Sequence, residues 1–168
     1  MQFAKAFQYK KWANSELLDI GERQLHLLPE SDAVFFIRIL NHTTVVDSLF
    51  ISRMSGTPEL YSADNTLETP TYSELKERIE KNDSWLVHFS ATAAPEILAK
   101  NIAFKFTDGD YGKLSVEETM IHLLTHGSNH RGMASRTLAS NGLERPKDTF
   151  TRYLHEIEPA AAKTECNT

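Results

Sequence analysis

Three histidines at a spacing of four residues, His122, His126 and His130, are the strongest chemical signal in this sequence. On a helix each lies one turn above the previous one and about 40° further around the axis, so neighbouring imidazoles come within chelating reach of one metal ion. The chain has 7 histidines in 168 residues. A random sequence of that composition would contain such a triplet about 0.01 times. The triplet therefore predicts a metal site on one face of a helix.

A single helix rarely supplies three ligands to one ion, because residues i and i+8 lie about 12 Å apart along the axis. The third ligand must then come from another segment. His42 is the natural donor because it sits in an apolar helical stretch, where an imidazole without a partner is costly to bury. The spacing by itself leaves two pairs open, His122 with His126 and His126 with His130. The other histidines sit near the ends of elements or among charges, where solvated or capping roles suffice: His26, His88 and His155.

Three neutral imidazoles would leave at least one position on the ion for water or a substrate atom, as in catalytic rather than structural zinc sites. Zinc or nickel is favoured, and imidazole ligands also suit iron or copper. An ion of this kind lowers the pKa of a bound water to about 7 or holds a thiol as its thiolate. The sequence has no GxSxG nucleophile motif, phosphate loop or dinucleotide fingerprint. The candidate metal site is therefore the only feature of the sequence that indicates a particular chemistry.

The elements that must position these histidines are long helices. Apolar residues recur at spacings of three and four in four segments, and two of these segments open with the capping-box pairs Thr71/Glu74 and Ser115/Glu118. A turn-rich stretch, 56–70, follows the second helix and is long enough to cross a bundle end. The predicted helices cover about 3–24, 30–55, 71–94 and 115–141.

A change of period before the last helix predicts a short β-hairpin. Ile102, Phe104 and Phe106 alternate ahead of Asp108-Gly109, a turn signal. Residues 146–156 are expected to add a terminal segment packed on the bundle. The fold class is thus all-α, a four-helix bundle with a crossover connection and a short β-hairpin insert before the last long helix. We expect one domain over residues 1–156 and a flexible C-terminal tail over 157–168.

Composition limits the partners of the chain. Eighteen Lys and Arg against 23 Asp and Glu give a net charge of −5, so a nucleic-acid partner is not expected. The only cysteine, Cys166, excludes an internal disulfide framework and favours a reducing compartment, which fits the cytoplasm. The sequence lacks a signal-peptide pattern and an uninterrupted apolar run of about 18 residues. We therefore expect no membrane partner.

Two segments carry a resemblance to a known family. LNHTTVVDSLF, with HLLTHGSNHRGM far downstream, is similar to the two signature segments of the DinB-like family of metal-binding four-helix bundles. YKKWANSELL and RPKDTFTRYLHE resemble the ends of the family, so the similarity covers nearly the whole chain. The resemblance implies that His42, His126 and His130 bind one divalent metal. Met133 stands where the family usually has glutamine, which argues against a polar role at that position.

The resemblance also points to residues around the ligands. His122 resembles a histidine often found one turn before the ligand pair, with a role beside the ligands or at an interface; Arg131 and Asn14 match further family positions. Asp47 is offset from His42 by about 140°, so it cannot easily share an ion with it. We expect Asp47 to orient a ligand on a neighbouring helix, to pair with Arg131, or to form a plain ion pair.

Two classes of function remain. One is a metal-dependent enzyme acting on a small molecule in a pocket bounded by the first, second and fourth long helices. The resemblance suggests a thiol-dependent transferase, because relatives include transferases and isomerases that use bacillithiol, mycothiol or glutathione; a hydrolase is also possible. The other class is a non-catalytic metal-binding or stress-response protein. A site that opens into a pocket would favour the enzyme.

A homodimer is expected as well, because relatives of this fold often pair and the first and last helices carry apolar residues on their outer faces.

Overall fold

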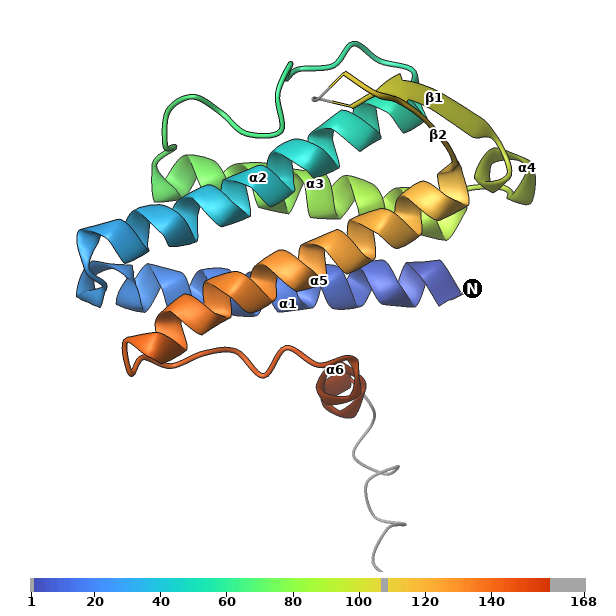
Figure 1. Ribbon diagram of the computed structural model, residues 1–168. Helices are drawn as coiled ribbons and strands as arrows, with labels where there is room; N and C mark the ends of the chain where they lie inside the picture. The colour runs from blue at the N-terminus through green and yellow to red at the C-terminus, as the bar shows by residue number, and fades with distance from the viewer. Residues whose placement is uncertain (1, 107–108, 158–168) are drawn as a thin grey trace, which may run out of the picture.

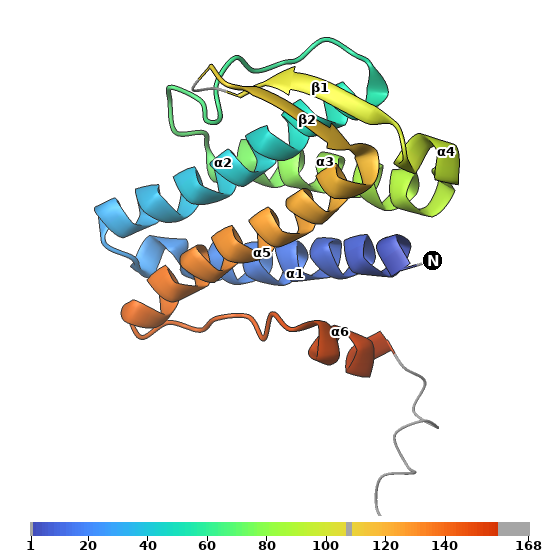
Figure 2. The ribbon, with the colours of Figure 1, turned by 45° about the vertical axis from the view of Figure 1, so that its right-hand side comes forward.

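Four long helices form the body of the molecule (Figures 1 and 2). The computed structural model describes residues 2–106 and 109–157 of the chain. Its elements are, in order, α1 (Gln2–Gln24), the 3-10 turn η1 (Leu25–Leu27), α2 (Glu30–Ser55), α3 (Tyr72–Thr92), α4 (Pro95–Leu98), β1 (Asn101–Lys105), β2 (Tyr111–Ser115), α5 (Val116–Ser140) and α6 (Phe150–Ile157). The predicted all-α bundle with a hairpin insert is confirmed.

The crossover lies between α2 and α3. The connection over residues 56–71 returns along the length of the bundle, so α2 and α3 run in the same direction and α1 and α5 run opposite to them (Figure 1). Helix α1 packs against α3 and α5, and α2 packs against the same two helices. Residues of α2 and α5, which are far apart in the sequence, are thereby brought into contact. A set of metal ligands divided between these two helices needs this arrangement.

The helix boundaries follow the predicted caps. The Thr71 side chain accepts from the Glu74 backbone N–H at 3.3 Å, and Ser115 accepts from that of Glu118 at 3.1 Å. Each glutamate carboxylate in turn accepts a hydrogen bond from the backbone N–H of its capping residue, so both are full capping boxes. Gly56 ends α2 in the left-handed region, with φ of 68°, where glycine carries no Cβ penalty.

The hairpin before α5 pairs β1 and β2 as antiparallel neighbours, with Phe104 opposite Gly112. It lies over the end of the bundle, in contact with α2 and α5 (Figure 2). Asp108, part of the predicted turn, lies outside the described residues. The turn η1 and the one-turn helix α4 carry no periodic signal, and the sequence did not predict them.

The C-terminal segment contains α6, which packs on α1 through Tyr153. This helix continues to Ile157, one residue past the expected domain boundary. The rest of the predicted flexible tail, 158–168, lies outside the described residues.

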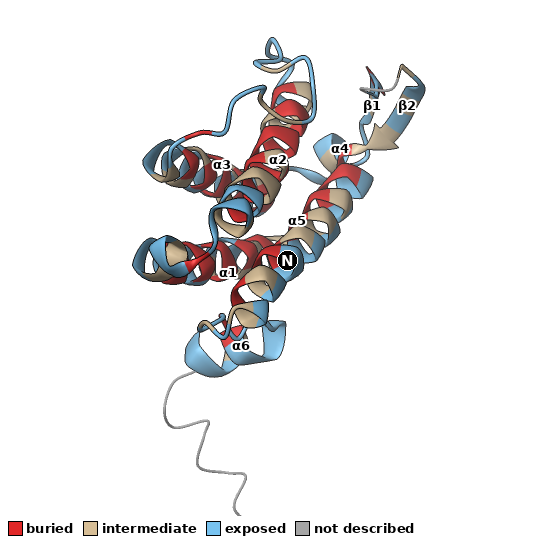
Figure 3. Ribbon diagram, turned by 60° about the vertical axis from the view of Figure 1, so that its left-hand side comes forward, coloured by how far each residue is buried: buried red, intermediate tan, exposed pale blue. Residues whose placement is uncertain are grey.

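The interior contains two apolar clusters and polar residues from the middle of the long helices. Figure 3 shows the buried residues on the helix faces that turn toward one another. One cluster includes Leu17, Phe36 and Leu138, and the other includes Phe50 and Met120. Buried polar side chains at central positions of α1, α2, α3 and α5 include Lys10, Asn14, Asp47, Asp83 and Arg131.

Helix α2 is long and apolar enough, by length and composition, to cross a membrane. Its most apolar stretch is 56% buried inside the bundle, and it carries Asn41, His42 and Asp47. The core helix of a soluble protein passes the same test, so the feature is weak evidence for a membrane span. The expectation of no membrane partner stays a prediction.

Candidate metal centre

Three imidazoles from two antiparallel helices converge on one point. His42 comes from the middle of α2, and His126 and His130 occupy successive turns of α5. The Nε2 atom of His126 lies 3.1 Å from Nε2 of His42 and 3.0 Å from Nε2 of His130. One ligand atom from each of the three residues lies within 4.8 Å of the others. The structure thus brings together the three histidines that the family resemblance selected.

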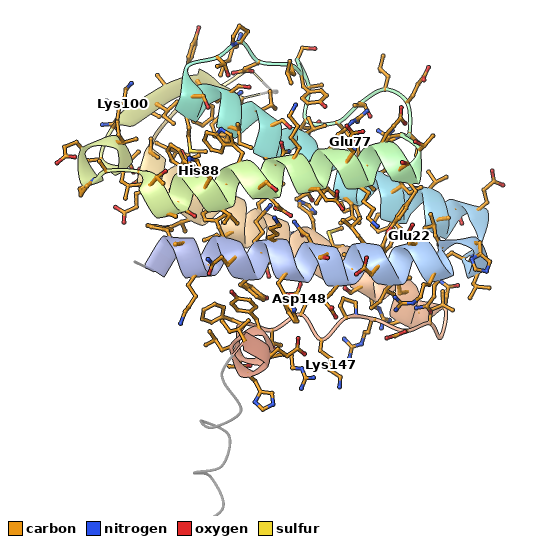
Figure 4. All side chains as sticks on the ribbon, turned by 180° about the vertical axis from the view of Figure 1, so that it is seen from behind. Glu22, Glu77, His88, Lys100, Lys147 and Asp148 are labelled. Carbon is orange, nitrogen blue, oxygen red and sulfur yellow. The ribbon has the colours of Figure 1, made fainter. Side chains whose placement is uncertain are left out.

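The remaining histidines lie apart from this point. His26, His88 and His155 are all exposed, and His88 projects from α3 on the opposite side of the molecule (Figure 4). These positions agree with the solvated roles expected for them.

A backbone carbonyl sets the orientation of His42. Its Nδ1 lies 2.8 Å from the carbonyl oxygen of Asp64, a residue of the crossover connection. A carbonyl only accepts, so Nδ1 must carry the proton and Nε2 keeps its lone pair. A partner on the outer nitrogen is the usual support of a metal-binding histidine. His42 is therefore held in the tautomer that binds a metal through Nε2.

The crossover connection is anchored so that Asp64 reaches His42. Asn41 donates to the side chains of Asn65 and Thr66 at 2.6 and 2.7 Å. Arg38 donates to the backbone carbonyl of Thr66 at 3.0 Å. Sequence reasoning missed Asp64, because a carbonyl is present at every residue and no side-chain pattern marks it.

Electrostatics keep His126 and His130 neutral. Burial, together with the neighbouring histidines and Lys10, lowers the pKa of His126 to about 3. The pKa of His130 is also lowered, first by burial and then by His42. A protonated imidazole is disfavoured here because it would lose hydration and face other cations. The imidazoles therefore offer lone pairs, as metal binding requires.

The donor set fits a divalent transition metal. Zn–N distances of about 2.0–2.1 Å place the nitrogens of a tetrahedral site about 3.3 Å apart, close to the 3.0 and 3.1 Å found here. The Nδ1 atoms of His126 and His130 are buried and have no hydrogen-bond partner among the described residues. If these atoms carry the protons, all three Nε2 lone pairs meet at the same point, an arrangement that a cation stabilises. The cluster could hold a metal ion.

The cluster opens into a pocket of about 260 Å³. Its walls are mostly apolar and come from α2, α5, the crossover connection and the hairpin. The prediction that α1 bounds the pocket is wrong, because the hairpin packs over α2 and α5 and closes that side instead. The lining residues are His42, Val46, Leu49, Phe50, Arg53, Asp64, Lys105, Phe106, Leu114, His122 and His126.

His122 is the one predicted neighbour of the ligands that lies beside them. Its ring centroid is 5.2 Å from that of His126 and 5.3 Å from that of Phe50, and it lines the pocket. Burial lowers its pKa, so it too is held neutral.

Asp47 and Asn14 belong to a buried ion network instead. The Lys10 ammonium donates to Asp47 at 2.6 Å and to Asp83 at 2.9 Å, and Asn14 donates to Asp83 at 2.7 Å. Lys10 and Asn14 lie on the same buried face of α1 as its apolar residues, so their side chains need polar partners on the neighbouring helices. Of the three alternatives for Asp47, the structure shows the plain ion pair, with Lys10 as the partner, while Arg131 pairs with Asp148.

Arg131 ties α5 to the segment that leads into α6. Its Nε donates to Asp148 at 2.7 Å, and the same carboxylate accepts from the Tyr9 hydroxyl. Asp148 belongs to this segment and lies on its side facing α1 (Figure 4). Burial and then Asp148 raise the pKa of Tyr9 to about 12, so its hydroxyl stays protonated as a donor. Arg131 thus has a structural partner, although it is adjacent in sequence to His130.

The fold and the site define a helical bundle with a three-histidine centre divided between its second and last long helices. The model of the DinB family matches residues 1–161, and the chain belongs to that family. Members of the family often bind a metal, which agrees with the histidine cluster. Neither a search of the curated proteins nor a search of the solved structures returned a match.

Proposed function

We propose that this protein is a divalent-metal-dependent enzyme, with His42, His126 and His130 as ligands, acting on a small molecule as a thiol-dependent transferase or a hydrolase. The observation that carries the proposal is the convergence of three imidazoles beside a mostly apolar pocket. A structural zinc ion would usually be closed by a fourth protein ligand. Of the described residues, no cysteine lines this pocket to supply one.

The residues around the cluster have separable roles. When bound, a divalent ion at this point would lower the pKa of a water to about 7 or hold a thiol as its thiolate. The Asp64 carbonyl orients His42, and the apolar walls exclude water from the substrate. His122 and the Asp64 carboxylate are the groups in the lining, besides the ligands, that can accept a proton. Zinc and nickel are the favoured metals, with iron and copper as alternatives.

Metal analysis tests the ligand set. Purified His42→Ala, His126→Ala and His130→Ala should each lose metal affinity by more than 100-fold, beyond the roughly 10- to 100-fold loss typical of a residue that only orients a ligand. His122→Ala and the exposed control His88→Ala should retain about one ion per chain. Full retention in His42→Ala would exclude a site shared between the two helices.

Activity is tested by screening metal-loaded protein for conjugation of electrophiles with low-molecular-weight thiols and for hydrolysis. The expected result is turnover by the wild type that His130→Ala abolishes. Equal activity of the two proteins on every substrate would instead support the alternative, a non-catalytic metal-binding protein.

We also propose a homodimer. The prediction that α1 contributes exposed apolar residues does not hold for its described residues; large exposed apolar side chains lie instead on α2, at Val34 and Phe35, and on α5, at Ile121 and Met133. Phe35 and Met133 line one shared groove between these helices. Sedimentation at micromolar concentration should give twice the 19.1 kDa chain mass. A monomer at that concentration would contradict the proposal, and Met133→Lys should shift a dimer toward monomer.

A further inference from the structure

The pocket beside the histidine cluster has two chemically different ends. On α2, His42, Val46, Leu49 and Arg53 follow one another at spacings of four, three and four and all line the pocket. At 1.5 Å per residue, the first and last of them lie about 16 Å apart along the helix axis. The pocket therefore runs along α2 from the imidazoles to a cationic end.

Arg53 is held in place at that end. Its guanidinium lies 4.9 Å from the ring centroid of Phe50 and 4.6 Å from that of Phe104, and its side chain is 10% exposed. Glu59 accepts from Nε at 2.8 Å and from Nη2 at 3.3 Å. A guanidinium carries five N–H donors, so this ion pair uses only part of them. Because two rings and a carboxylate fix its orientation, Arg53 can bind an anion at a low cost in side-chain entropy.

The hairpin adds a second cationic side chain to the pocket lining, after Arg53, and covers one side of the pocket. Lys105 of β1 is exposed and lines the pocket together with Phe106, and its Nζ lies 5.9 Å from the ring centroid of Tyr111. Gly112 on β2 makes this cover possible, because a Cβ there would lie 2.6 to 2.7 Å from the rings of Phe104 and Phe106. Between the two ends, the lining is apolar: Val46, Leu49, Phe50, Phe106 and Leu114.

We infer that the substrate has a small apolar body, a metal-directed group at one end and a single carboxylate at the other, which Arg53 and Lys105 bind. The inference rests on the proposed function and adds the class of substrate. A volume of about 260 Å³ falls below the roughly 300–1,000 Å³ of pockets for drug-sized ligands, so the body is no larger than one ring or a short branched chain. Glu59 already offsets part of the charge of Arg53, which favours a monoanion over a dianion.

The test uses a matched pair of thiols that differ only in charge at the far end. Zinc-loaded protein is titrated calorimetrically with 4-(mercaptomethyl)benzoate and with 4-(mercaptomethyl)benzamide. A hydrogen bond to a charged group contributes about 1.5–3 kcal/mol, so the acid should bind about 10- to 100-fold more tightly than the amide. Arg53→Gln should remove most of this preference with its zinc content unchanged. The exposed control Arg145→Gln, away from the pocket, should keep the preference.

The outcomes separate the two claims. Zinc binding with equal affinity for acid and amide would overturn the substrate class and leave the metal site standing. Failure to bind zinc would overturn the proposed function, and with it this inference. If Arg53→Gln does not fold, the variant Lys105→Gln, on the exposed strand β1, replaces it in the titration. A reduced preference for the acid over the amide supports the inference, and an unchanged preference overturns it.

Discussion

Two polar clusters share helix α2 but differ in how their members are satisfied. In the buried network, the Lys10 ammonium lies between the carboxylates of Asp47 and Asp83, at 2.6 and 2.9 Å. Each charge has an opposite charge in contact, and Asp47 Oδ1 is the one side-chain atom of these three residues without a hydrogen-bond partner among the described residues. The charges of this network are therefore paired with one another without a ligand.

The three histidines of the cluster include no anion, and the carboxylate of Asp64 lies beside them, with Oδ2 3.9 Å from Nδ1 of His42. His42, His126 and His130 point nitrogen atoms at one another, and the outer nitrogens of two of them are buried without partners. Lys10 adds a positive field behind His126, which further disfavours its protonation. Unlike the network, the cluster also opens into a pocket. The comparison teaches that burial of polar residues does not by itself mark a functional site. A functional site is marked by ligand atoms that converge on one point and have no charged partner in the protein.

Breaking the ion network should have the largest effect. Lys10→Met leaves two buried carboxylates without their cation, so the free energy of unfolding should fall by about 3–5 kcal/mol. Urea denaturation measures this change. The control Lys76→Met removes a half-buried lysine at the surface that pairs with the exposed Glu22, and it should change stability little. Equal effects of the two variants would mean that the network is not what stabilises the middle of the bundle.

Completing the histidine cluster should stabilise the protein. Zinc at 100 times its dissociation constant should raise the free energy of unfolding by about 2.7 kcal/mol, because the ion binds the folded state. His126→Ala should abolish this increase, while the increase should persist in His88→Ala. Thermal denaturation with and without zinc measures it, and an increase that survives in His126→Ala would place the ion elsewhere.

The two clusters should respond to pH with opposite signs in metal-free protein. Burial raises the pKa of Asp47 from 3.8 in the unfolded chain to about 6. Its contribution to stability is therefore present below pH 4 and is lost as the pH rises through 6. As the pH rises from 4 to 6, the free energy of unfolding of Asp47→Asn should therefore increase relative to that of the wild type, by on the order of 2 kcal/mol.

His126 behaves in the reverse way. Its pKa is lowered from 6.5 to about 3, so its contribution is present above pH 6.5 and is lost as the pH falls toward 3. His126→Ala should therefore lose less stability on acidification than the wild type. Urea denaturation at several pH values between 4 and 7.5 tests both signs, and parallel curves for the two variants would contradict the comparison.

The smallest effect concerns two glycines of α5. A Cβ on Gly132 meets nothing within 4 Å, so Gly132→Ala should stabilise the helix by about 0.5–1 kcal/mol. A Cβ on Gly127 would lie 3.1 Å from Cε of Lys10 and would press on the network. Gly127→Ala should therefore be the less stable variant. A stability gain of the same size in both would show that the lysine side chain moves freely over α5.

Local sequence determined the elements and the ligand candidates. The capping boxes at Thr71 and Ser115 place the start of α3 and α5, because a cap depends on residues within one turn. The spacing of His126 and His130 puts both on one helix face for the same reason, and family resemblance selected this pair and His42. Helical periodicity also turned Lys10 and Asn14 inward along the stripe of α1.

Only the tertiary structure decided which partners these residues meet. Lys10 contacts Asp47 and Asp83 because of the order in which four helices pack, and no local spacing encodes that order. The support of His42 is a carbonyl of Asp64, which any residue at that position would supply. The hairpin rather than α1 closes the pocket, because the crossover and hairpin connections place their chains over α2 and α5. Helical spacing is a property of neighbouring residues, whereas a site shared between helices depends on packing across the whole chain.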